Sequence, residues 1–205
     1  MKTIAKLAAV VTVAFATLSS HASAVISLTG GTALTMPVTN LFSSGPVEIV
    51  PGVTFTSSVN SSVSGYVGGY GFSSNGTWSG APAMIGLNSG SGTFELAFAN
   101  AISGFVGDLN WTVGYGPDAS ISIYDASNVL LESITLENGL NLVDPGFNGF
   151  QRATNDISFV RFSNEYIGVR SISTASAANN VPEPASLALF GIGLAGLVIS
   201  RRKAR

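Results

Sequence analysis

Large apolar side chains occupy every second position of Phe94-Glu95-Leu96-Ala97-Phe98 and of Leu109-Asn110-Trp111-Thr112-Val113-Gly114-Tyr115. Successive side chains of a strand point to opposite faces of its sheet, so this alternation predicts strands with one buried face. Trp111 shares a face with Leu109 and Val113 and is expected in the core. No stretch between residues 25 and 180 shows helical periodicity.

The same pattern predicts further strands, separated by turn signals such as Asn138-Gly139 and Asp144-Pro145-Gly146. They are expected over Ile26–Met36, Val47–Thr56, Val63–Phe72, Ser120–Tyr124, Val129–Leu136, Asp156–Phe162 and Tyr166–Ser173. Many short strands rich in Gly, Ser and Thr favour an all-β antiparallel β-sandwich of the jelly-roll kind. Because the chain has no cysteine, packing alone must hold such a domain together.

The first 24 residues predict a secretory signal peptide that forms a helix. Lys2 and Lys6 accompany an apolar run over 7–18, and Ala22-Ser23-Ala24 has the small-x-small pattern that signal peptidase accepts. The run is shorter than the ~20 residues that cross a bilayer core, so cleavage after Ala24 is expected rather than permanent anchoring.

The C-terminal 25 residues predict a short transmembrane helix between two motifs. The tripeptide Pro182-Glu183-Pro184 precedes an apolar run over 185–199, and the chain ends in a basic cluster of Arg201, Arg202, Lys203 and Arg205. Basic residues remain on the cytoplasmic side of a membrane, so everything before the cluster is expected outside. The apolar run is again short for a lasting span and suits a transient stop.

This tail resembles the PEP-CTERM sorting signal of Gram-negative bacteria, with all three parts in the required order. The resemblance implies cleavage near the tripeptide by an exosortase, a membrane cysteine protease. It implies an exported protein, held transiently in the inner membrane and then placed at the cell surface, in the outer membrane or outside the cell. Proteins with this signal are associated with exopolysaccharide and biofilm production.

The middle of the chain resembles the β-sandwich ectodomain of many PEP-CTERM proteins, a fold compared with carbohydrate-binding folds. The resemblance spans most of residues 47–172 and includes Pro51-Gly52-Val53-Thr54-Phe55 and Ile157-Ser158-Phe159-Val160-Arg161-Phe162. It implies a fold and a setting but no site residues. The expected organisation is a signal peptide over 1–24, a sandwich over 25–172, a flexible spacer over 173–180 and the sorting signal over 181–205.

The charge of the middle section excludes several classes of function. Residues 25–180 contain three arginines, no lysine and ten carboxylates, a net charge of −7. Such a domain repels phosphate backbones, which argues against nucleic-acid binding. Without Cys, His or Lys it also lacks the usual thiol, imidazole and lysine catalysts and His/Cys metal sites. We therefore expect a non-enzymatic protein, with a carboxylate-based glycoside hydrolase as the less favoured alternative.

A carbohydrate-binding module is the favoured interpretation, and a purely structural matrix protein without sugar affinity is the alternative. Sugar binding needs exposed aromatic rings beside polar groups. The aromatic candidates are Tyr66, Tyr70, Trp78, Trp111, Tyr115, Tyr124 and Tyr166. Trp78 in a polar Gly-rich loop, and Tyr66 and Tyr70 on one face of a Gly-rich strand, are preferred. A structural Ca²⁺ is compatible with loops containing Asp144, Asn148, Asn155, Asp156 and Asp118, but no spacing defines a ligand set.

Overall fold

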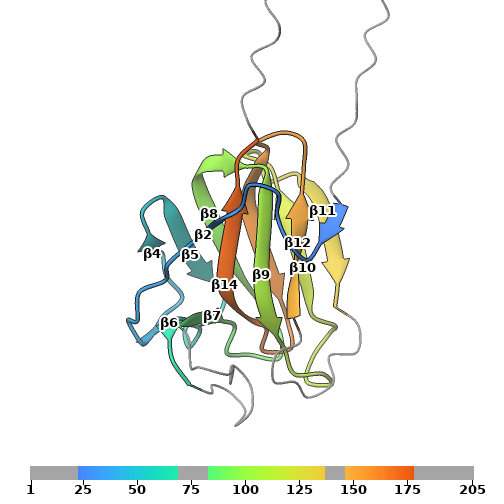
Figure 1. Ribbon diagram of the computed structural model, residues 1–205. Coiled ribbons are helices and arrows are strands. Elements are labelled where there is room, and N and C mark those ends of the chain that lie inside the picture. Colours follow the sequence, from blue (N-terminus) through green and yellow to red (C-terminus); the bar gives the residue numbers. More distant parts are fainter. Residues whose placement is uncertain (1–22, 69–82, 137–145, 178–205) are drawn as a thin grey trace, which may run out of the picture.

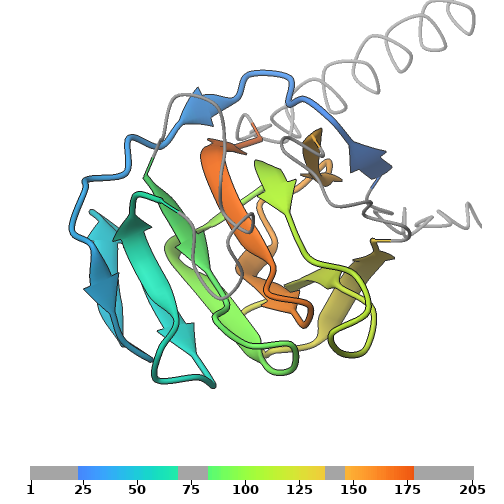
Figure 2. The same cartoon turned by 90° about the horizontal axis from the view of Figure 1, so that it is seen from below.

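Two antiparallel sheets pack against each other as a β-sandwich (Figure 1). The computed structural model describes residues 23–68, 83–136 and 146–177, which form strands and no helix. Figure 2 shows the same arrangement from below. The prediction of an all-β antiparallel sandwich is confirmed, whereas the expected terminal helices lie outside the described residues.

The first layer, sheet A, has eight strands. Its order from edge to edge is β1 (Ser23–Val25), β12 (Gly146–Gln151), β9 (Gly104–Asn110), β14 (Gly168–Ala175), β7 (Met84–Gly86), β6 (Val63–Tyr66) and β3 (Leu41–Phe42). The eighth strand, β2 (Thr32–Ala33), pairs with β14 beyond the end of β7. Strand β14 therefore has neighbours on both edges along its length.

The second layer, sheet B, has six strands. Its order is β11 (Leu130–Thr135), β10 (Ser120–Tyr124), β13 (Ile157–Ser163), β8 (Thr93–Ile102), β5 (Val53–Ser57) and β4 (Val47–Val50). The long central strands β8 and β13 pair with each other although they are distant in sequence. Sheet B thus also depends on contacts between the two halves of the chain.

Several strand boundaries differ from the sequence-based expectation. The expected strand Val47–Thr56 is a hairpin, because Pro51-Gly52 turns the chain and Gly52 has a φ of 80°. Only β2 forms within the expected strand Ile26–Met36, and the rest is irregular. Strand β14 continues to Ala175, so the first residues of the expected spacer belong to sheet A.

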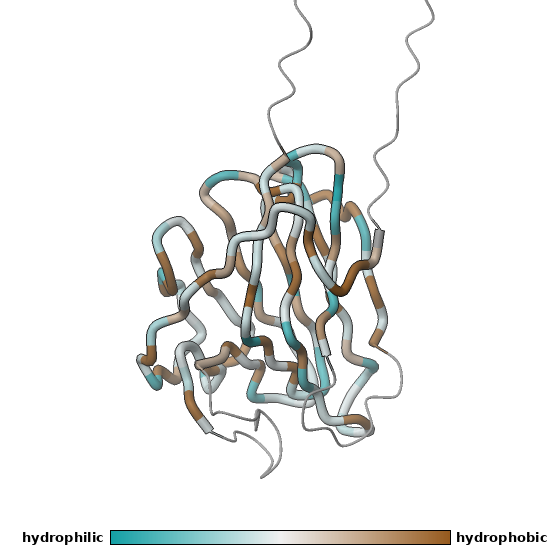
Figure 3. The backbone as a smooth tube through the Cα atoms, in the orientation of Figure 1, coloured by the Kyte–Doolittle hydropathy of each residue, from teal (hydrophilic) through white to brown (hydrophobic). Residues whose placement is uncertain are grey.

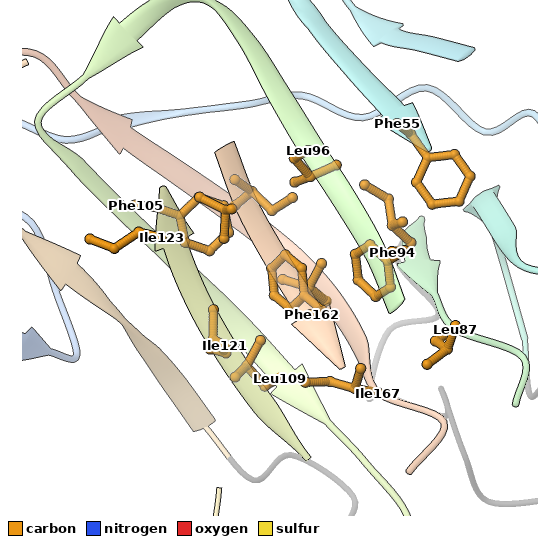
Figure 4. Packing of buried hydrophobic residues seen from close by; sticks show 14 of the residues in the cluster. Phe55, Leu87, Phe94, Leu96, Phe105, Leu109, Ile121, Ile123, Phe162 and Ile167 are labelled. Atoms are coloured by element: carbon orange, nitrogen blue, oxygen red, sulfur yellow. The ribbon is translucent and has the colours of Figure 1, made fainter. Parts of the chain in front are cut away.

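The core between the sheets is built around a row of phenylalanine rings (Figure 4). Phe94 and Phe162 stack with centroids 4.4 Å apart, Phe55 lies 5.9 Å from Phe94, and Phe105 of sheet A meets Phe162 edge-on at 5.7 Å. These four side chains are fully buried. Polar residues alternate with the core residues along the strands (Figure 3), as the period of two predicts.

Trp111 is also buried, with 7% of its surface exposed, which confirms its predicted core position. The buried face that Trp111 shares with Leu109 does not extend beyond Trp111, because Val113 and Tyr115 are 45% and 55% exposed. Strand β9 stops at Asn110, and the chain after Trp111 forms a loop. The predicted alternation is therefore correct for Leu109 and Trp111 and wrong for the two residues that follow.

The two ends of the described chain lie at the same end of the sandwich (Figure 1). Ser23 pairs with Gln151, Gln151 pairs with Gly104, and Gly104 pairs with Ala175, so these residues form one row across sheet A. Ala177 is held nearby through both backbone groups by the side chain of Asn155. We call this the terminal end and the opposite end the loop end.

The loop end is organised by the buried carboxylate of Glu165. This carboxylate accepts hydrogen bonds from the backbone N–H groups of Gly114 at 2.7 Å and Ala119 at 3.2 Å. Glu165 is 2% exposed and lies in the left-handed region with a φ of 46°. A Cβ on Gly90 would lie 1.8 Å from the carbonyl oxygen of Tyr115, so only glycine permits the two loops to cross here.

Candidate functional site

The outward face of sheet B carries the polar side chains of its strands. Along β13, Val160 and Phe162 are buried in the core, which turns Phe159, Arg161 and Ser163 to the opposite face. Residues paired across an antiparallel sheet share a face, so the register of β13 with its neighbours defines what surrounds Arg161. We call this surface the sheet B face.

Two neighbouring rows of the sheet B face are entirely polar. The first row crosses five strands and consists of Ser133, Ser122, Arg161, Glu95 and Thr56. The second row consists of Thr135, Ser120, Ser163 and Thr93. Seven of these nine side chains are hydroxyls, and the other two are the opposite charges of Arg161 and Glu95. These two rows therefore offer many hydrogen-bonding groups and no net charge.

Arg161 is fixed by three neighbours. Its Nε and Nη2 donate to Oε2 of Glu95 at 3.0 and 2.6 Å, and Nη2 also donates to Oδ1 of Asn128 at 3.1 Å. Its guanidinium carbon lies 4.3 Å from the ring centroid of Tyr124, within cation–π distance. Burial lowers the pKa of Arg161, but the hydrogen bonds and charge of Glu95 outweigh it, so the pKa lies above its ordinary value.

Two aromatic residues lie beside this pair. Tyr124 of β10 pairs directly with Phe159 of β13, so both point to the sheet B face, and both are half-buried. The next residue in their row is Ala97 of β8, which leaves space over the strand. Aromatic surface adjacent to fixed hydrogen-bonding groups suits ligands that have both C–H faces and hydroxyls.

An open hollow lies next to Arg161 and Glu95. It measures about 260 Å³, and its walls are Thr56, Ser57, Ser58, Thr93, Glu95 and Arg161. All six side chains are polar. The hydroxyls of Ser57 and Ser58 already donate to the carbonyl oxygen of Thr93, which orders this wall. The hollow can therefore receive a small polar group, such as one ring of a sugar polymer.

Sheet A offers a different surface. A hollow of about 340 Å³ over its outward face is lined by Ile26, Ser27, Leu28, Gly31, Val106, Phe147 and Ser173. Its walls are mainly apolar and contain no charged residue. The nearby Asp108 and Arg170 form an ion pair across β9 and β14, but both side chains are largely buried. With two serines as its polar side chains, this hollow offers fewer hydrogen-bonding groups to a hydroxyl-rich ligand than the sheet B face.

Tyr66 lies in sheet A and not near the sheet B face. Its ring meets Phe42 edge-on with centroids 5.1 Å apart, and the pair packs beside the buried residues Val63 and Met84. Phe42 is 51% exposed and Tyr66 is half-buried. Tyr70 and Trp78, the other two preferred sugar-binding residues, lie outside the described residues. All three remain predictions.

The sequence pattern missed the central pair of the sheet B face. Tyr124 was among the aromatic candidates, but Glu95 and Arg161 are separated by 66 positions and become neighbours only through the β8–β13 register. The sequence does carry one signal for Glu95 and Arg161, because both lie at outward positions of strands with strict alternation. Without the register of β13 with β8, however, the sequence does not show that the two residues are neighbours.

No metal site emerges from the described ranges, in which no three Asp, Glu or His side chains are grouped. Both carboxylate oxygens of Asp156 accept hydrogen bonds from Arg152, at 2.6 and 2.7 Å, which raise the pKa of Arg152 above its ordinary value. Asn155 is bonded to Ala177, and Asp144 lies outside the described residues. Asp156 and Asn155, which lie in loops considered for Ca²⁺, are thus engaged in structural contacts.

The predicted C-terminal motif lies beyond the described chain, and the predicted signal-cleavage motif overlaps its first residues. Residues 180–203 match the model of the PEP-CTERM protein-sorting motif. The chain carries a PEP-CTERM sorting motif. It includes Pro182, Glu183, Pro184, Arg201, Arg202 and Lys203, while Arg205 follows the matched stretch. Across the ranges with described structure, no helix is both long and apolar enough to span a membrane.

At the other end, Ala22 lies outside the described residues, and Ala24 lies in β1, paired with Phe150. The expected cleavage after Ala24 would therefore divide β1 and leave Val25 paired with Gly149. The predicted N-terminal cleavage point thus lies within the first strand of the sandwich, whereas the PEP-CTERM motif follows the last strand in the sequence.

Solved structures similar to this chain include sugar-binding domains. A Streptococcus pneumoniae fucose binding module has a TM-score of 0.34 at 12% identity, covering 60% of this chain and 93% of that one. The lectin domain of lectinolysin, complexed with Lewis B antigen, gives 0.37 and 12%, covering 62% and 94%. A mutant of a family 29 carbohydrate binding module gives 0.37 and 13%, covering 79% and 99%. No curated protein sequence matches this chain significantly.

Proposed function

We propose that this protein is exported, processed by signal peptidase and an exosortase, and binds exopolysaccharide without catalysing a reaction. The PEP-CTERM motif supports the sorting route. The observation that carries the binding proposal is the sheet B face, where Arg161 and Glu95 stand beside the rings of Tyr124 and Phe159. In this arrangement the rings cover C–H faces of a sugar while the ion pair bonds its hydroxyls.

The state of the carboxylates supports a non-enzymatic role. Six of them are engaged in structural contacts. Glu95, Asp108 and Asp156 pair with arginines, Glu48 and Asp125 accept backbone N–H groups of nearby turns, and Glu165 holds the loop end. A glycoside hydrolase needs two carboxylates facing one bond of the substrate, which these contacts disfavour.

Binding is tested by two variants with matched controls. We expect Arg161→Met and Phe159→Ala each to weaken retention on a polysaccharide array by roughly tenfold, because each removes one charged hydrogen-bonding group or one ring contact. The controls are Arg152→Met, which removes another paired arginine, and Phe147→Ala, which removes an exposed ring from sheet A. Both controls should bind like the unaltered protein.

The array is run with and without Ca²⁺ and includes Trp78→Ala and Tyr70→Ala. Loss of binding in these two variants alone would show that the binding site does not lie on the sheet B face. Retention of the protein in biofilm without affinity for any polymer would favour the purely structural matrix protein. Melting temperatures of all variants separate lost binding from lost folding.

A further inference from the structure

The arginines of the domain are all neutralised by carboxylates. Arg152 pairs with Asp156 at 2.6 Å, Arg161 with Glu95 at 2.6 Å and Arg170 with Asp108 at 2.5 Å. Residues 25–180 contain no lysine and no histidine. Every cationic side chain of the domain therefore already has an anionic partner in the fold.

This pairing has a direct consequence for the ligand. A uronate, sulfate or phosphate group binds proteins mainly through arginine or lysine, and it must compete here with Glu95 for the Arg161 guanidinium. The incoming anion would also approach Glu95 itself, within a domain whose net charge is −7. Like charges brought together at a binding face oppose association.

A polycation is equally unsuited to the hollow beside Arg161 and Glu95. Glu95 is the only carboxylate in the wall of the hollow, and its charge is balanced by Arg161. In the parts of the chain with described structure, no three acidic side chains are grouped so that they could hold a metal ion. The rest of the wall consists of hydroxyls, which bond neutral partners as readily as charged ones.

We infer that the ligand of the sheet B face is a neutral, hydroxyl-rich polysaccharide, and that anionic polysaccharides are excluded. The inference rests on the proposed function and adds the chemical class of the ligand. A chain of neutral rings places its hydroxyls on Arg161, Glu95 and the neighbouring serines without displacing the ion pair. Binding of this kind releases no counterions and depends little on salt.

The experiment compares immobilised neutral polymers, namely β-glucan, xyloglucan and galactomannan, with the anionic polymers alginate, polygalacturonate and hyaluronan. The purified full chain is applied in a detergent without a sugar head group. We expect retention on at least one neutral polymer, unchanged between about 0.1 and 1 M salt, over which the Debye length falls from ~10 to ~3 Å. We expect no retention on the anionic polymers.

The variant Glu95→Gln releases Arg161 from its partner while keeping the shape of the side chain. It should acquire retention on anionic polymers, which salt then removes. Retention of the unaltered protein on an anionic polymer, lost in Arg161→Met, would overturn the inference and leave polysaccharide binding standing. Retention on none of the polymers would instead count against the proposed function, and the inference would fail with it.

Discussion

Replacement of Arg170 by alanine is expected to lower the free energy of unfolding by about 3–5 kcal/mol, because it leaves a buried carboxylate without its cation. The Nε of Arg170 donates to Oδ2 of Asp108 at 2.5 Å, and Asp108 is 4% exposed. The other carboxylate oxygen, Oδ1, is buried without a hydrogen-bond partner. This carboxylate therefore depends strongly on Arg170. Urea unfolding followed by circular dichroism measures the change.

Arg161→Ala is the matched control, since Arg161 also pairs with a carboxylate across two strands but is more exposed. We expect Arg161→Ala to lower the free energy of unfolding by about 1 kcal/mol. The double variant Asp108→Leu with Arg170→Met removes both charges and should recover most of the stability. Equal losses of unfolding free energy for Arg170→Ala and Arg161→Ala would show that burial of the Asp108–Arg170 pair does not determine its contribution to stability.

Phe162→Ala is expected to lower the free energy of unfolding by about 3–5 kcal/mol, the range for removing a buried ring and leaving a cavity. Phe162 is fully buried and contacts two other rings, one from each sheet, with Phe94 stacked on it at 4.4 Å and Phe105 edge-on at 5.7 Å. Its removal therefore weakens the contact between the sheets as well as the packing within sheet B. Urea unfolding again gives the value.

Phe159→Ala controls for the loss of a phenylalanine from the same strand. Phe159 differs in pointing to the sheet B face, where it is half-buried, so we expect a cost of about 1 kcal/mol. The expected difference between the two variants rests on the inward and outward assignment of β13. Similar costs for both would contradict that assignment, and with it the composition of the sheet B face.

The sequence predicts most of the fold because alternation reports directly on burial. Phe94, Leu96, Ile121 and Ile123, all predicted on buried faces, are fully buried. Two of the errors occur where glycine or proline interrupts the pattern. Pro51-Gly52 converts one expected strand into the β4–β5 hairpin, and the first residues of β9 were missed because Gly104 and Gly107 carry no side chain to show a period.

The site is less predictable than the fold, because it depends on which strands are neighbours. The sequence identifies Tyr124 as a candidate ring and Glu95 as one of ten carboxylates, but only the register brings both to Arg161. Register between strands distant in sequence is set by the packing of the whole core, which no local pattern records. The same holds for Glu165, whose role at the loop end requires two loops distant in sequence to meet.

The position of β14 sets a limit on when this domain can fold. It is an interior strand of sheet A, bonded to β9 on one edge and to β7 and β2 on the other, and it ends at Ala175, shortly before the sorting motif begins at residue 180. If the chain crosses a membrane from its N-terminus, the edges of β9 and β7 that face β14 stay open until almost the whole domain has emerged, although β9 can already pair with β12 and β7 with β6. On the proposed export route, sheet A would then be completed only when the sorting motif is about to enter the membrane, which would link the completion of folding to sorting.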